Sequence, residues 1–88
     1  MNFSFILGEK KYIQFEIRSM IQQKVVITDA TWILLDTEGK EVLTGNCEIE
    51  DNILRLLLEP DAIGEYILEV TYSIPPEIRK VRCEINVS

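Results

Sequence analysis

Alternation of apolar and polar residues at every second position is the feature that most constrains the fold of this chain. It is clearest over residues 11–18, where Ile13, Phe15 and Ile17 alternate with polar side chains, and again over residues 78–87. A period of two residues is typical of a strand with one face in a core and the other in water. No long segment shows the 3.6-residue period of an amphipathic helix. The sequence therefore predicts an all-β protein.

Turn-forming residues divide the alternating pattern into short segments. The expected strands cover residues 3–7, 11–18, 30–36, 40–44, 47–50, 53–59, 66–72 and 78–87. Residues 19–24 carry no clear period and are expected to form a loop or one helical turn. A chain of 88 residues is one small domain, and without helices it has no parallel crossovers. We expect residues 1–88 to form one antiparallel β-sandwich of about seven strands, with a small barrel as the alternative.

The charge balance narrows the classes of partner. The chain has 15 acidic and 9 basic residues, which gives a formal net charge of −6. An acidic protein is repelled by nucleic acids and by anionic membrane surfaces, so neither is an expected partner. No run approaches the roughly 20 apolar residues of a membrane span, and the apolar residues 3–7 are too few for a signal peptide. The expected location is the cytoplasm.

The residues that carry most enzyme chemistry are absent or badly placed. The chain has no histidine to activate a nucleophile, and Cys47 and Cys83 alternate with apolar neighbours, as small buried hydrophobes do. A disulfide between them requires that their strands face each other. The acidic turns at 50–52 and 59–61 supply too few oxygens for Ca²⁺. Several carboxylates lie at outward positions where they are normally solvated: Glu48, Glu50, Glu65, Glu69 and Glu84. We expect no enzymatic activity, no metal and no cofactor.

A tyrosine at the point where a loop becomes a strand gives the most specific signal. In "EPDAIGEYILEV", Asp61, Gly64 and Tyr66 resemble the tyrosine corner of immunoglobulin-like sandwiches, and Trp32 resembles the core tryptophan of strand C in that family. The resemblance implies an immunoglobulin-like sandwich in which the Tyr66 ring closes one end of the core. Its hydroxyl would bond to the backbone a few residues upstream, and Gly64 would let the loop pass beneath the ring. These four residues are expected to be structural.

A second resemblance points to a biological setting. The phrase "TDATWILLDTEGKEVLTG", followed by "GEYILEVTY", is similar to small immunoglobulin-like domains of phage and prophage structural proteins. The family's inter-sheet disulfide would lie at Phe15 or Ile17 and at Leu68, where this chain has no cysteine. This departure suits a domain of the cytoplasm or of a virion.

Three aliphatic residues lie at outward positions. Ile33 and Leu35 alternate with the inward Trp32 and Leu34. Ile67 likewise lies between the inward Tyr66 and Leu68. In the immunoglobulin-like arrangement strands C and F are adjacent, so Ile33, Leu35 and Ile67 would gather on one outer face and form a contact surface. Scattered exposed hydrophobics, or cover by residues 19–24, are the alternatives.

The expected function is therefore a non-catalytic structural or interaction module. It would assemble with itself or with a protein partner, such as a phage particle, through that face or through a sheet edge. Arg79, Lys80 and Arg82 are expected to guard an edge against added strands. The alternative is a module that binds a small ligand or a carbohydrate, for which Tyr12 and Phe3 are the available aromatics.

Overall fold

The computed structural model describes residues 1–18 and 25–88, which form eight strands and no helix. The strands are β1 (Asn2–Phe5), β2 (Lys11–Glu16), β3 (Asp29–Leu35), β4 (Glu41–Asn46), β5 (Glu48–Glu50), β6 (Ile53–Leu58), β7 (Gly64–Ile74) and β8 (Glu77–Val87). The all-β prediction is confirmed. The loop or helical turn expected at residues 19–24 lies outside the described residues.

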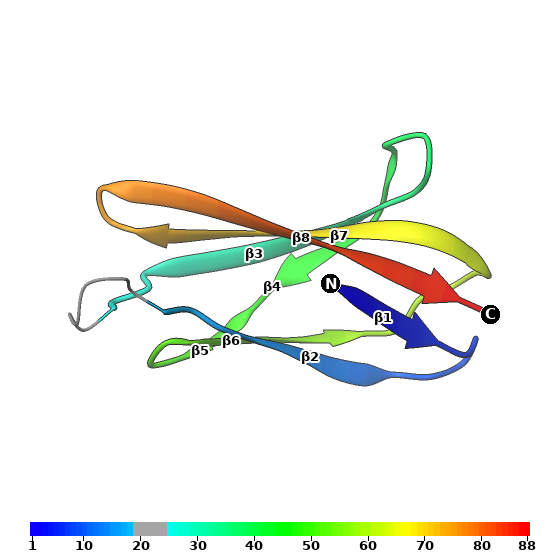
Figure 1. The fold of residues 1–88 in the computed structure, drawn as a ribbon, viewed down its shortest axis with the longest axis horizontal. Coiled ribbons are helices and arrows are strands. Elements are labelled where there is room, and N and C mark those ends of the chain that lie inside the picture. Colours follow the sequence, from blue (N-terminus) through cyan, green and yellow to red (C-terminus); the bar gives the residue numbers. More distant parts are fainter. Residues whose placement is uncertain (19–24) are drawn as a thin grey trace.

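The strands form two separate sheets, which Figure 1 shows as two layers. One sheet has the order β1-β8-β7-β3-β4 and the other has the order β2-β6-β5. Two separate sheets favour the sandwich over the barrel. All ladders are antiparallel except that between β1 and β8, which is parallel. A parallel neighbour is possible here because the chain leaves β1 for the other sheet and reaches β8 only at its end.

The chain crosses between the sheets without a long loop. β4 pairs with β3 in the larger sheet, and β5 pairs with β6 in the smaller one. Only Cys47 separates these two edge strands, and its backbone N–H donates to the carbonyl oxygen of Ala30 at 3.0 Å. One extended segment thus contributes an edge strand to each sheet and joins the two layers on that side.

Alternate residues of both sheets meet in a single apolar core. The buried hydrophobic residues are Phe5, Ile13, Phe15, Ile17, Ile27, Ala30, Trp32, Leu34, Leu54, Leu56, Leu58, Leu68, Val70, Tyr72, Cys83, Ile85 and Val87. No polar or charged residue is buried among the described residues. The stability of the sandwich therefore comes from apolar burial together with the hydrogen bonds of the two sheets.

The β7–β8 hairpin is the longest element, and it extends beyond its neighbours (Figure 1). Each strand has 11 residues, with Pro75 and Pro76 between them. β1 pairs with β8 only over Glu84 to Val87, so residues 77–83 of β8 have no second neighbour among the described strands. The three basic residues expected to guard an edge lie on this segment.

Candidate functional site

Tyr66 lies near the start of β7, after the loop that leads out of β6. Its hydroxyl donates a hydrogen bond to the carbonyl oxygen of Ala62 at 2.9 Å. The ring packs over Gly64, whose φ of +150° suits glycine, and an added β-carbon there would lie 3.6 Å from the Tyr66 hydroxyl oxygen. The half-buried ring packs against the core, whereas Asp61 is exposed. The loop and the strand are thus joined by the hydroxyl and by the ring.

The three outward aliphatic residues lie on one face of the larger sheet. The β3–β7 ladder places Leu35 directly opposite Ile67, whereas Ile33 lies opposite Glu69. All three side chains are half-buried rather than fully exposed. The fold therefore brings Leu35 and Ile67 together, with Ile33 one row further along the same face.

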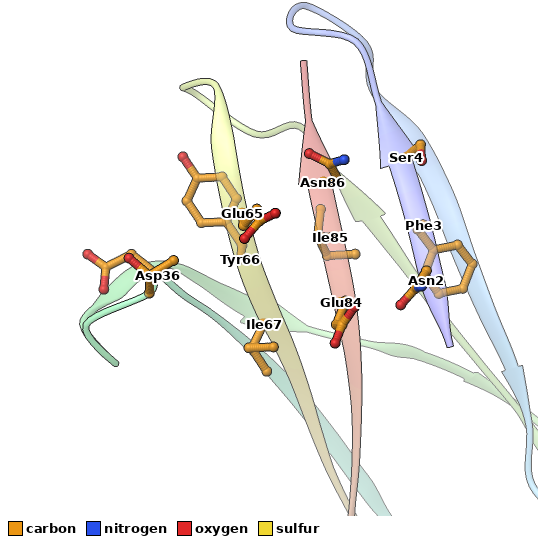
Figure 2. Close-up of a pocket in the computed structure, with 11 residues that line it drawn as sticks. Asn2, Phe3, Ser4, Asp36, Glu65, Tyr66, Ile67, Glu84, Ile85 and Asn86 are labelled. Carbon is orange, nitrogen blue, oxygen red and sulfur yellow. The ribbon is translucent and has the colours of Figure 1, made fainter.

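Leu35 and Ile67 lie in a depression, here called the outer-face groove. It consists of two adjoining hollows of about 320 and 560 Å³ that share Asp36, Thr37, Ile67 and Glu84. The first also includes Glu65 and Asn2, and the second includes Leu35, Met1 and Arg82. Figure 2 shows the first hollow, with Asp36 on the β3–β4 turn and the other labelled residues on β7, β8 and β1.

The turn after β3 forms one wall of the groove. The Asp36 Oδ1 accepts hydrogen bonds from the backbone N–H groups of Glu38 and Lys40, each at 2.9 Å. The Asp36 carbonyl accepts a third bond from the N–H of Gly39 at 3.0 Å, and Gly39 has a φ of +80°. These bonds fix the turn, and with it the wall, beside β7.

The groove is acidic. Asp36, Glu65 and Glu84 all line it, and none of these carboxylates forms an ion pair with a described residue. Glu84 Oε2 can accept a hydrogen bond at 2.9 Å from the side-chain nitrogen of Asn2 on the neighbouring strand. The result is an apolar floor bordered by three carboxylates that form no ion pair with a described residue, with Arg82 and Met1 at the end of the second hollow.

The next row of the same face has a different charge balance. Glu69 accepts from Lys80 Nζ at 3.0 Å and from Arg82 Nε at 2.7 Å, and its side chain is only 13% exposed. These two hydrogen bonds lower the pKa of the Glu69 carboxyl. Negative charge is therefore neutralised in this row and left unpaired in the groove.

The two cysteines do not supply a thiolate near neutral pH. Cys47 and Cys83 are free thiols, and burial raises the pKa of each to about 11, so both are protonated near neutral pH. Among residues 1–18 and 25–88 no three acidic, cysteine or histidine side chains lie close enough together to hold a metal ion. The groove can act through shape, apolar contact and charge.

The exposed aromatic surface is small. Tyr12 on β2 is 56% exposed and lies opposite Leu57, and the Arg55 guanidinium lies 4.8 Å from the centre of its ring. Phe3 is half-buried and packs edge-on against Phe15, with ring centres 6.5 Å apart. Of the two aromatic residues considered for carbohydrate binding, Tyr12 is the more exposed, and Phe3 packs against another ring.

The sequence predicts which side chains face outward, but it does not predict that they meet in a groove. Outward parity marks Leu35, Ile67, Glu65 and Glu84 individually. Their meeting depends on the register that sets Ile67 opposite Glu84, and on the turn that brings Asp36 beside them. The turn sequence that starts at Asp36 is the local sequence feature that predicts the turn beside β7.

Family models and curated sequences do not identify a relative of this chain. No protein-family model matches the chain, and no similar sequence is found among curated proteins. No helix in the described part of the chain has the length and apolar character to cross a membrane.

Proposed function

We propose that this chain is a non-catalytic interaction module with an immunoglobulin-like fold, and that it binds a protein partner in the outer-face groove. The observation that carries the proposal is the pairing of Leu35 with Ile67 beneath three carboxylates that have no described ion-pair partner. An apolar floor supplies binding energy when water leaves it, and the charged rim selects the partner.

Three features support the immunoglobulin-like assignment. The order β1-β8-β7-β3-β4 corresponds to strands A′, G, F, C and C′ of that family, and β2-β6-β5 corresponds to B, E and D. The bond from Tyr66 to Ala62 has the geometry of the tyrosine corner at the start of strand F. Trp32 is buried on β3, where the family has its core tryptophan.

The proposed setting is a phage or prophage particle, on the strength of the resemblance of residues 28–45 and 64–72 to such structural domains. The neighbouring genes test this setting. Capsid and tail genes on either side are the expected result, and a gene surrounded by metabolic enzymes would contradict the virion assignment without affecting the groove.

Selection from a random peptide display library tests the groove. Peptides selected on the wild-type protein are expected to bind it in calorimetry and to lose at least tenfold in affinity for Ile67→Lys, which places a charge on the groove floor. Ile33→Lys is the matched control, because Ile33 lies on the same face outside the two hollows. Circular dichroism checks that both variants keep the fold. If no peptide is enriched, or if Ile67→Lys binds as well as the wild type, the proposal fails.

A further inference from the structure

The chemistry of the outer-face groove defines the segment that would fit it. Its floor is aliphatic, and Asp36, Glu65 and Glu84 have no basic partner among the described residues. Positive charge in the lining comes from Arg82, which already bonds to Glu69, and from the amino group of Met1 in the second hollow. A complementary segment must therefore present an exposed aliphatic side chain beside basic ones.

This chain has such a segment at the tip of the β7–β8 hairpin. Ile78 is 71% exposed, the largest exposed fraction among the described large hydrophobic residues. Arg79 and Lys80 follow it directly, and both side chains are about half exposed. The tip therefore combines the aliphatic and the basic side chains that a complementary segment needs.

The existing ion pair of Arg79 does not prevent such a contact. Arg79 pairs with Glu77 at the surface, whereas Lys80 pairs with Glu69, whose side chain is only 13% exposed. The exposed Arg79–Glu77 pair contributes little to stability, so Arg79 can exchange its partner.

The groove and the hairpin tip of one molecule cannot meet. Ile67 on the groove floor and Ser73 beside Ile78 are both on β7, and at about 3.3 Å per residue they lie roughly 20 Å apart along a continuous strand. The molecule is 41 Å long, and β7 and β8 run through both surfaces. Any contact between the two surfaces must therefore join different copies.

We propose that the hairpin tip of one copy, with Ile78, Arg79 and Lys80, docks in the outer-face groove of the next. This inference rests on the proposed function and names a second copy of the chain as the occupant. The contact joins two different surfaces, a tip and a groove. Assembly then closes into a ring, of which a dimer with two reciprocal contacts is the smallest, or continues as a filament.

Complementation between two variants tests this contact by sedimentation velocity over a range from micromolar to millimolar protein. Ile78→Asp removes the tip and Ile67→Lys blocks the groove. The wild type is expected to assemble into a dimer or a larger species as its concentration rises, and each variant alone is expected to remain a monomer. An equimolar mixture of the variants should stop at a dimer, because it contains one intact groove and one intact tip per pair.

Other outcomes overturn the inference. A wild type that stays monomeric at millimolar concentration contradicts it, as does a mixture of variants that stays monomeric while the wild type assembles. Ile33→Lys serves as the control and should assemble as the wild type does. If peptides bind the groove but the wild type remains a monomer, the contact between tip and groove fails and the proposed function stands. If neither occurs, both fail.

Discussion

The indole ring of Trp32 packs directly on the backbone of Gly45. The two residues lie opposite each other on β3 and β4, and a β-carbon added at position 45 would be only 2.7 Å from Trp32 Nε1 and 2.9 Å from Cε2. β4 can therefore approach the core only because residue 45 has no side chain. The largest core residue and the edge strand are fitted to each other at this point.

Gly45→Val is expected to lower the free energy of unfolding by about 1–3 kcal/mol, because the added side chain must displace the indole or the edge strand. Urea denaturation followed by Trp32 fluorescence measures this change. The control is Asn46→Val at the next, exposed position of the same strand, which should change stability by less than about 0.5 kcal/mol. Equal midpoints for the two variants would show that the contact is not tight.

The contact between Trp32 and Gly45 marks the limit of sequence reasoning here. The alternation of Ile13, Phe15 and Ile17 predicted their burial correctly, because parity is a local property. The sequence predicted that the fourth strand ends at residue 44, before Gly45, but β4 continues to Asn46. Glycine weakens a strand locally, but the packing of an indole from a distant strand outweighs that preference.

Two other differences between the predicted and the observed structure arise at a sheet edge and from the register of the strands. Ile49 alternates with polar residues at the same parity as Cys47, a pattern that predicts burial, but it is 39% exposed because β5 is a three-residue edge strand with little sheet around it. The parity of Leu35 and Ile67 was readable from the sequence, whereas their contact with Asp36 and Glu84 was not. Parity belongs to one strand, but a groove depends on how several strands are aligned.

Tyr66→Phe is expected to lower the free energy of unfolding by about 1 kcal/mol, because it removes the hydrogen bond to Ala62 and keeps the ring. Thermal or urea unfolding measures the loss. Tyr12→Phe is the matched control, since the Tyr12 side chain is exposed on the other sheet and its hydroxyl bonds to no described residue. If the two variants are equally stable, the corner hydroxyl does not contribute to stability.

Glu69 should make stability depend on pH. Because its pKa is lowered in the folded state from an ordinary value near 4.5, the unfolded chain binds its proton at a higher pH. The stabilisation from Glu69 is therefore fully present above about pH 4.5 and is lost as the pH falls through the folded pKa. Glu69→Gln should show a shallower loss of stability than the wild type below pH 4.5 in urea titrations.

The cause of this shift can be tested separately by an NMR titration of the Glu69 carboxyl. Lys80→Met and Arg82→Met each remove one hydrogen-bond donor, so each should raise the pKa of Glu69 toward its usual value. Arg55→Met removes a basic residue from the other sheet and should leave the Glu69 pKa unchanged. An unshifted pKa in the Lys80 and Arg82 variants would contradict the assigned cause.

The two thiols should differ in access but share a high pKa. Cys47 is half-buried and Cys83 is buried, and burial raises both pKa values to about 11. In Cys83→Ala, alkylation of Cys47 by iodoacetamide should accelerate about tenfold per pH unit from 8 to 10, because only the thiolate reacts. In Cys47→Ala, Cys83 should be labelled only as fast as the protein unfolds, and urea should expose it. A Cys47 rate that levels off near pH 9 would mean an ordinary thiol pKa, and therefore a more open joint between β4 and β5 than the one described.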